Sequence, residues 1–350
     1  MSLITDQPEG FRQFDVVTDD SDHSYLNHWN NKSTKNNNNN NGVSDWYGNP
    51  SSGVHKKIMK EWRVLERNLP EGVYVRVYER RLDLLRAAIV GPAGTPYHDG
   101  VFVFDVAFPP DYPARPPLVH YRSFGMRINP NLYANGKVCL SLLNTWFGSR
   151  NEKWNPGEST VLQILVSIQG LVLNKNPFFN EPGAALSITG RQNKKSMAYT
   201  ENAFILSCIT MVYLLKKPPK NFEPFISTHF RDRSTHILSA CNAYMNSRAA
   251  VGCYETGSDK GFKVSKKFQA LMKSWYPHLV VVFKGTGASL GSLEQLMVSN
   301  GNDSDVKKKE KQQQKKKSSG FWKLIGIVKR VLGCKKVSAE KRVKVNSSSS

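Results

Sequence analysis

The sequence predicts an α+β fold in which an amino-terminal helix, a four-stranded antiparallel meander and carboxy-terminal helices share one core. Three observations predict it. Apolar residues recur at helical spacing over 54–69, strand-like alternation and apolar runs occupy 73–122, and helical periodicity returns over 159–245. Turn-forming clusters such as Gly91-Pro92-Ala93-Gly94 separate the strand-like runs. This order of elements places the helices at the two ends of the domain and the sheet between them.

The first helix is predicted from its apolar face, with lysine and arginine residues on the opposite side. Its apolar positions are Val54, Ile58, Trp62, Leu65 and Leu69. Strands are predicted over 73–77, 84–90, 101–108 and 118–122. The last of these is short because it follows a proline-rich corner that cannot pair as a central strand.

Ser159 or Thr160 can cap a helix that ends before Asn176-Pro177. Two further helices are predicted over 197–216 and 222–245, and Pro218-Pro219 prevents one continuous helix. A mixture of aromatic residues and lysines over 262–282 predicts another helix with a short extended piece that packs on the core.

Composition divides the chain into four parts. Residues 1–52 are predicted to be a disordered acidic and Asn-rich segment, since Asp19-Asp20-Ser21-Asp22 and the run 36–41 offer little apolar surface to bury. The main folded domain is predicted over 53–247, and an extension that packs on the core over 248–290. Residues 291–350 are predicted to be a disordered basic tail, with an amphipathic helix near 320–334.

The chain has a formal net charge of +21, and much of it lies in this tail. Three interpretations of the tail stay open: an anionic membrane surface bound through 320–336, with Cys334 as a lipidation site, nuclear import directed by the lysine runs, or no defined role. The core has no basic stripe interleaved with aromatic residues, so nucleic-acid binding is not expected.

The five cysteines are scattered and form no Cys-x-x-Cys pair, which argues against a disulfide framework or a metal site. The sequence shows no secretory signal and no run of apolar residues long enough to span a membrane. We therefore expect a cytoplasmic or nuclear protein, peripheral on endomembranes if the tail binds them, and not a secreted one.

Cys139 is the candidate nucleophile. It stands eight positions after Asn131, which is the last residue of the turn-forming sequence Asn129-Pro130-Asn131. Proline fixes one backbone dihedral angle, and a second turn follows at Asn135-Gly136, so rigid backbone is predicted to hold the thiol at a surface. The competing interpretation is a buried packing cysteine, the usual role of a single cysteine in an apolar run.

Further motifs flank this cysteine in a fixed order. They are Phe108-Pro109-Pro110-Asp111-Tyr112-Pro113, Trp154-Asn155-Pro156-Gly157 and Asn176-Pro177. In this order the chain resembles a ubiquitin-conjugating enzyme over roughly residues 54–247. The Asn-Pro-Asn turn, the long segment between Cys139 and Trp154, and the loop Pro177-Phe178-Phe179-Asn180-Glu181-Pro182 resemble one branch of that family. This branch contains the large hybrid conjugating/ligase enzymes and the plant phosphate-regulating type.

The resemblance implies a transferase with the ubiquitin-conjugating fold. Cys139 would accept ubiquitin as a thioester from the activating enzyme and pass it to substrate lysines, and Asn131 would stabilise the oxyanion or hold the active-site loop. The implied partners are ubiquitin, the activating enzyme, protein substrates and a ubiquitin ligase, which would face Ala114, Pro156 and Gly157. No metal or cofactor is implied, because the activating enzyme is the one that consumes ATP.

The chain departs from the common family pattern at several positions. Asn129 replaces the usual histidine, but its side chain can make a similar local bond to the backbone. Ser141 stands where many members have an acidic residue that activates the lysine, so Glu181 is the candidate carboxylate. Ala114 replaces a frequent aromatic anchor, which predicts weak binding of ordinary ligases and a built-in ligase character.

Two alternatives to a ubiquitin carrier stay open. One is a catalytically weak ubiquitin-binding scaffold, which the serine at position 141 keeps in consideration. The other is a carrier of a ubiquitin-like modifier that uses the same thioester chemistry. A charging assay with each modifier discriminates among these possibilities.

Overall fold

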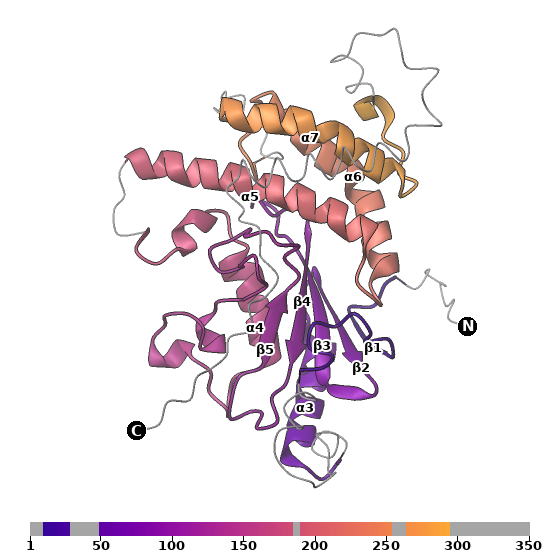
Figure 1. Ribbon diagram of the computed structural model, residues 1–350, viewed down its shortest axis with the longest axis vertical. Helices are drawn as coiled ribbons and strands as arrows, with labels where there is room; N and C mark the ends of the chain where they lie inside the picture. Colours follow the sequence, from indigo (N-terminus) through magenta and orange to yellow (C-terminus); the bar gives the residue numbers. More distant parts are fainter. Residues whose placement is uncertain (1–9, 29–48, 185–189, 254–263, 295–350) are drawn as a thin grey trace, which may run out of the picture.

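The computed structural model describes residues 10–28, 49–184, 190–253 and 264–294 (Figure 1). The predicted basic tail and its amphipathic helix near 320–334 lie outside the described residues. Figure 1 shows a twisted sheet with α3 near one end and the long helices α5, α6 and α7 stacked across the other.

The sheet has five strands in the order β1-β2-β3-β4-β5. Their bounds are β1 (Phe14–Val17), β2 (Val73–Tyr78), β3 (Arg81–Val90), β4 (Val101–Ala107) and β5 (Leu118–Tyr121). Strands β2 to β5 form the predicted antiparallel meander, and Val75 lies opposite Ala87, which lies opposite Phe104. The additional strand β1 pairs with β2 in parallel.

The helices follow the predicted order. Their bounds are α3 (Gly53–Asn68), α4 (Val161–Ser167), α5 (Gly190–Lys216), α6 (Glu223–Met245) and α7 (Lys266–Lys284). Helix α4 continues as a π-helical turn, η3 (Ile168–Val172), and three short 3-10 turns are η1 (Ser141–Leu143), η2 (Arg150–Glu152) and η4 (Pro177–Asn180). The Thr160 side chain caps α4 by accepting a hydrogen bond from Gln163 N.

The main core lies on one face of the sheet, where helices pack against it. Inward-facing strand residues such as Val75, Leu85 and Phe104 are fully buried, as are Leu65 of α3 and Ile164 of α4. Helix α7 packs on α6 and α5, and its Trp275 is fully buried. The elements that surround the candidate nucleophile are therefore anchored in one continuous core.

The other face of the sheet is covered by the segment 10–28. Asp22 of this segment forms ion pairs with Arg86 and Arg122, and Arg86 also pairs with Asp105 on the neighbouring strand. Arg86 has no exposed surface and Asp105 is 2% exposed. The prediction of a disordered segment over 1–52 is therefore wrong for residues 10–28, which form β1 and supply Asp22 as a partner to the buried Arg86.

Within the described residues, one helical stretch, Asn193–Lys216, has the length and hydropathy of a membrane span, with a mean hydropathy of 1.3. However, 67% of that window is buried inside the protein. Residues such as Phe204, Ile209 and Val212 are fully buried there. The apolar character of this helix is accounted for by its place in the core.

Candidate functional site

The turn at Asn129 is pinned by its own side chain. Asn129 Oδ1 accepts a hydrogen bond from the Asn131 backbone N–H at 2.9 Å. Its Nδ2 donates to Tyr97 Oη at 2.8 Å and to the Val172 carbonyl at 2.7 Å. Asn129 is fully buried. The local bond expected of asparagine is present, and the same side chain also fixes the turn to η3.

Asn131 and Cys139 are joined by two hydrogen bonds. The Cys139 N–H donates to the Asn131 carbonyl at 2.9 Å, and Asn131 Nδ2 donates to the Cys139 carbonyl at 2.8 Å. Asn131 Oδ1 is buried and, among the described residues, has no hydrogen-bond partner. In this state the Asn131 amide therefore holds the loop that carries the cysteine.

Thr145 clamps the peptide groups on both sides of Cys139. Its hydroxyl accepts a hydrogen bond from Leu140 N at 3.0 Å and donates to the Val138 carbonyl at 2.9 Å. The chain returns to this position because Asn144, which ends η1, adopts the left-handed conformation with φ of 54°. The backbone of Cys139 is thus fixed by Asn131 on one side and by Thr145 on the other.

The sequence predicts that the Cys139 thiol lies at a surface, but the residue is only 1% exposed, so this prediction is wrong for the structure described. Burial raises the pKa of Cys139 above its ordinary value. The charge of Lys137 and hydrogen bonding with the side chains of Tyr133 and Thr145 offset part of this rise in pKa. The thiolate form of Cys139 is therefore less favoured in the folded protein than in an exposed cysteine.

Ser141 ties the segment around Phe147 to the loop that carries Cys139. Its hydroxyl donates to the Phe147 carbonyl at 2.8 Å. A Cβ atom at Gly148 would stand 2.4 Å from Ser141 Oγ and 2.9 Å from Glu152 Oε2. A side chain at this position would meet both groups, so only glycine permits the approach, and the Ser141 hydroxyl and the Glu152 carboxylate lie on the same side of Gly148.

Glu181 lies near the turn but is paired. Its Oε2 accepts a hydrogen bond from Arg127 Nη2 at 3.2 Å, and the same nitrogen donates to the Pro130 carbonyl at 3.1 Å. The Arg127 guanidinium also stacks on the Tyr133 ring, 4.4 Å from its centroid. Arg127 therefore connects Glu181, Pro130 and Tyr133 on one side of the site.

A cavity of about 1130 Å³ opens beside this loop. It is lined by Asn131 and Ser141 from the loop, by Trp146 and Glu152 from the segment after it, and by Leu171 of η3. The cavity thus reaches Asn131, which is bonded to Cys139, and Leu140 and Ser141, which follow it, but Cys139 itself does not line it. Its walls combine apolar side chains with carboxylate, amide and hydroxyl groups.

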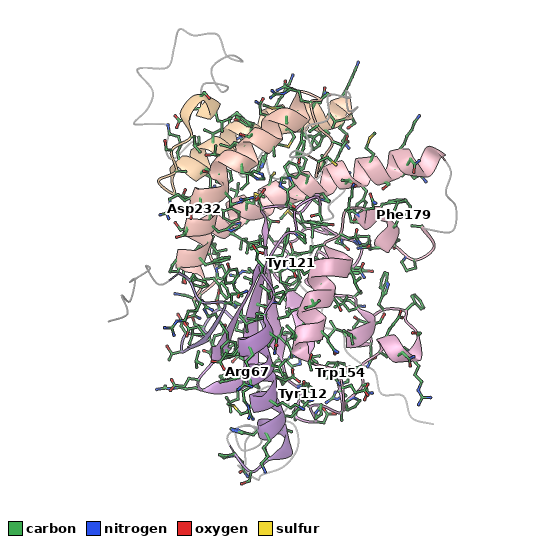
Figure 2. All side chains as sticks on the ribbon, turned by 180° about the vertical axis from the view of Figure 1, so that it is seen from behind. Arg67, Tyr112, Tyr121, Trp154, Phe179 and Asp232 are labelled. Atoms are coloured by element: carbon green, nitrogen blue, oxygen red, sulfur yellow. The ribbon has the colours of Figure 1, made fainter. Side chains whose placement is uncertain are left out.

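The residues expected to face a ligase lie on two adjacent loops. Ala114 is exposed on the proline-rich corner, and Pro156 and Gly157 are exposed on the loop that precedes α4. Trp154 Nε1 donates to the Pro113 carbonyl at 2.7 Å and joins the two loops. Figure 2 shows Trp154 close to Tyr112 at the α3 end of the domain. These loops form one surface, which the sequence motifs alone did not establish.

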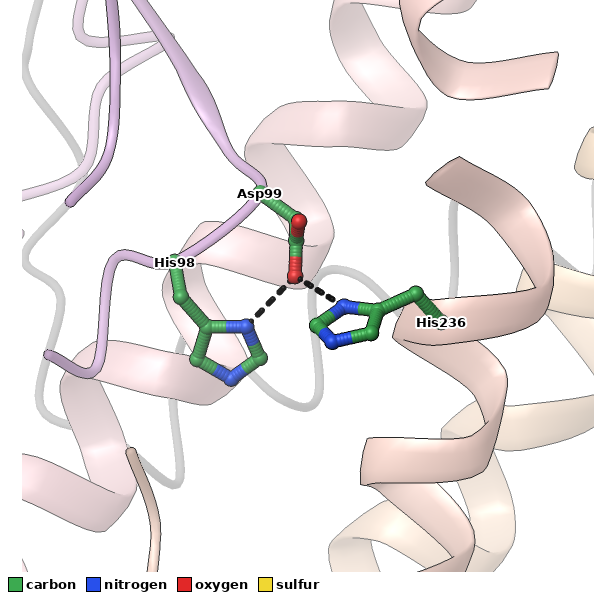
Figure 3. A group of neighbouring side chains, drawn as sticks. All are labelled: His98, Asp99 and His236. Atoms are coloured by element: carbon green, nitrogen blue, oxygen red, sulfur yellow. Dashed lines mark hydrogen bonds and ion pairs between the residues drawn. The ribbon is translucent and has the colours of Figure 1, made fainter. Parts of the chain in front are cut away.

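A second polar cluster joins the loop 91–100 to α6 (Figure 3). Asp99 Oδ2 lies 2.7 Å from His98 Nδ1 and 2.8 Å from His236 Nδ1, while Arg233 Nε donates to Asp99 Oδ1 at 2.6 Å. Burial raises the pKa of Asp99, but hydrogen bonds and charges of His98, His236 and Arg233 outweigh it and hold the pKa well below its usual range.

The three donor atoms of this cluster lie within 4.8 Å of one another, as metal ligands would. Yet Arg233 is bonded to the same carboxylate, and a divalent cation would be repelled by its charge. Both oxygens of Asp99 already have partners. The cluster therefore joins the loop 91–100 to α6. The sequence analysis did not predict this contact.

The sequence motifs located the cysteine and its turn, but they missed Thr145, Arg127 and Glu152. Thr145 and Glu152 lie in the long segment between Cys139 and Trp154. None of the motifs covers this segment, so no fixed spacing indicated a role for either residue. Gly148 was the available signal, since a glycine between aromatic and polar residues often marks a close backbone approach.

The fold and the cysteine loop are those of a ubiquitin-conjugating domain. The family model described as "Ubiquitin-conjugating enzyme" matches residues 57–204. Ubiquitin-conjugating enzyme E2 38 of Arabidopsis thaliana is 45% identical over 299 residues, covering 83% of this chain and 87% of that relative.

The chain belongs to the ubiquitin-conjugating enzyme family. It is also 53% identical over 237 residues to Arabidopsis ubiquitin-conjugating enzyme E2 25, covering 67% of this chain and 36% of the relative. It is 39% identical over 227 residues to the human dual E2 ubiquitin-conjugating enzyme/E3 ubiquitin-protein ligase BIRC6, covering 62% of this chain and 5% of that protein. The chain spans only about a third of the length of several of the relatives it matches, 29% in one case and 36% in another.

Proposed function

We propose that this protein is a ubiquitin-conjugating transferase in which Cys139 carries ubiquitin as a thioester. The observation that carries the proposal is the double fixation of Cys139 by Asn131 and Thr145 beside a cavity of about 1130 Å³. A carrier cysteine needs a rigid backbone and space for the carried chain beside the sulfur. Family membership and the names of the relatives support the same activity.

The chemistry takes two steps at one sulfur atom. The Cys139 thiolate attacks the thioester carbonyl carbon of ubiquitin held on the activating enzyme, and the enzyme's thiolate leaves. In the second step, a lysine amine attacks the new thioester, a C–N bond forms, and the C–S bond breaks with its electron pair on Cys139. The overall second step releases one proton for each substrate ammonium group consumed.

Asn131 supports this chemistry by holding the loop, which is one of the two roles the resemblance implies. Its Nδ2 is already bound to the Cys139 carbonyl. A role at the oxyanion would require the amide to leave that carbonyl in the transition state. The proposal therefore assigns loop fixation to Asn131 as its first role.

The proposed partners follow from the exposed surfaces. Helix α3 presents Lys56, Lys60, Arg63 and Arg67 to solvent, a basic face suited to the activating enzyme. Exposed Ala114 offers a ligase little apolar surface, which supports some ligase-independent transfer. A related protein that is named as a dual conjugating enzyme and ligase supports this proposal. We propose that the transfer uses no cofactor on this protein and that the protein acts in the cytoplasm or nucleus.

A charging assay tests the proposal. The protein is incubated with activating enzyme, ATP and ubiquitin, and gels are compared with and without thiol reductant, with Cys139→Ala beside the wild type. We expect a reductant-sensitive adduct of one ubiquitin that the variant lacks. An adduct only with a ubiquitin-like modifier would favour a carrier of that modifier, and no adduct at all would favour a non-catalytic scaffold.

A further inference from the structure

We propose that Glu152, in the segment between Cys139 and Trp154, is the carboxylate that receives the substrate lysine. The inference rests on the proposed function, since it concerns the second step at Cys139. A lysine reaches the site as an ammonium ion with an ordinary pKa of about 10.4, and it must lose a proton before it can attack. A carboxylate beside the thioester orients the ammonium group and accepts this proton.

The position of Glu152 is set by the close approach of two chain segments. The Cβ position of Gly148 lies 2.4 Å from Ser141 Oγ and 2.9 Å from Glu152 Oε2. Because no side chain occupies that position, the two polar groups share one small region. Ser141 is two residues after Cys139 and is itself held by its bond to the Phe147 carbonyl. The segment thus supplies a carboxylate where the loop itself has only a hydroxyl group.

The carboxylate of Glu152 is oriented and still able to accept a hydrogen bond. Its Oε2 accepts from the Ser149 backbone N–H at 2.7 Å, which fixes the side chain at the start of η2. Within the described residues, Glu152 forms no ion pair at 4.0 Å or less. Its other oxygen can therefore face a lysine without first releasing a cation.

The other two carboxylates near the site are less available. Glu181 is bonded to Arg127 at 3.2 Å, and this cation would have to be displaced by the lysine. Glu158 also lines the cavity, where its Oε2 accepts from Asn155 Nδ2 at 3.0 Å. Glu152, by contrast, lies on the same side of Gly148 as the Ser141 hydroxyl group.

The cavity can hold the rest of the lysine side chain. Trp146 and Leu171 line it together with Glu152, and they offer apolar surface to the methylene groups. Asn131 lines the same cavity, and its buried Oδ1 lacks a partner among the described residues. This oxygen is a second acceptor for an N–H group of the incoming amine.

The reaction balances with the groups named. The substrate ammonium group gives one proton to Glu152, and the free amine attacks the thioester carbonyl carbon. As the C–S bond breaks, its electron pair goes to the Cys139 sulfur. The nitrogen loses a second proton, which protonates the thiolate, and the proton held by Glu152 passes to water. The products are an isopeptide, the free thiol and one proton.

Single-turnover discharge of the charged protein onto free lysine tests this role. Glu152→Gln keeps an oxygen that can accept from Ser149 N, so the segment should keep its fold and Cys139 should still charge. We expect discharge to lysine to slow by roughly 100-fold at neutral pH, with the loss shrinking as pH rises. Discharge to hydroxylamine, which is unprotonated at neutral pH, should change little.

Glu158→Gln and Glu181→Gln are the matched controls, and Glu152→Asp tests recovery by a shorter carboxylate. Wild-type rates in Glu152→Gln would overturn the inference, and so would an equal loss in either control or an equal loss with hydroxylamine. These outcomes are measured on protein that has already charged. A failure of the proposed function would instead prevent charging of the wild type.

Discussion

Asn131 and Cys139 form a closed pair, in which each residue donates one hydrogen bond to the carbonyl of the other, at 2.8 and 2.9 Å. The side-chain bond is the only one of the two that substitution can remove without changing the backbone. Because Asn131 is also bonded to the Asn129 side chain, this bond connects the turn at Asn129 to the backbone of Cys139.

Replacing Asn131 with Asp should loosen this loop. A carboxylate cannot donate to the Cys139 carbonyl, and we expect a loss of about 1 to 3 kcal/mol in the free energy of unfolding together with slower charging. Urea unfolding and the charging assay measure the two effects. Asn135→Asp is the control, because Asn135 Oδ1 only accepts, from Lys137 N, and an aspartate can do the same. Equal behaviour of the two variants would contradict the role given to the amide.

Replacing Thr145 with Val should misplace Cys139 and raise its pKa further. The valine has a similar shape but leaves Leu140 N and the Val138 carbonyl without their hydroxyl partner. Hydrogen bonding with Thr145 also lowers the pKa of the thiol. We expect alkylation of Cys139 at pH 8 to slow and the rate profile to move to higher pH, with recovery in Thr145→Ser. An unchanged pH profile in the valine variant would show that the Thr145 hydroxyl does not affect the Cys139 thiol.

The segment 10–28 should be essential for stability. Arg86→Met leaves Asp105 buried without its main cation, and breaking a buried pair in this way costs about 3 to 5 kcal/mol. Asp22→Asn should cost less, since Asp22 is partly exposed and Arg86 keeps Asp105. Thermal unfolding measures both variants, and protease cleavage within 10–28 reports whether the segment detaches first. Equal stability of Arg86→Met and wild type would refute this account.

Stability should fall as the solution becomes acidic. Burial lowers the pKa of His23, so the folded protein resists a proton that the unfolded chain accepts, and stability is lost as pH falls below about 6.5. Burial raises the pKa of Asp105, but the charges of His23 and Arg86 bring it down to about 2. Its contribution, about 2 kcal/mol, is present above an ordinary pKa near 4 and lost as pH falls toward 2.

Urea unfolding midpoints measured from pH 7.5 to 3 would follow this loss. His23→Gln can still donate to the Leu85 carbonyl, which the native ring nitrogen contacts at 3.0 Å. This variant should therefore lack the decrease that begins near pH 6.5 and keep the one that begins near pH 4. A decrease near pH 6.5 that persists unchanged in the variant would exclude His23 as its source.

The sequence predicted the meander and the helices because their apolar residues repeat at the spacing of each element. It did not predict β1, since Phe14–Val17 is only four residues long and is surrounded by polar sequence. Arg86 and Asp105 each stand inside a mostly apolar run, and the run itself does not indicate which segment covers their charges. The acidic run 19–22, opposite basic strand residues, was the one signal that could have suggested the contact.

The site divides in the same way. The Asn-Pro-Asn turn and the position of Cys139 could be found because they follow short-range rules of turn geometry. The roles of Thr145 and Glu152 depend on how a longer segment folds back on the loop, and they became visible only through Asn144, Gly148 and Ser141 in three dimensions. Long-range contacts of this kind leave no regular spacing in the chain.

The contacts of Asp99 with Arg233 and His236 of α6 have a practical consequence for preparing shortened forms of the protein. The match to the family model stops at residue 204, inside α5 and before α6 begins. A fragment cut there would leave the Asp99 carboxylate without Arg233 and His236, and it would expose the apolar surface that Phe230 and Trp275 now cover. Soluble fragments for crystallisation or labelling should therefore keep residues 10–294 together.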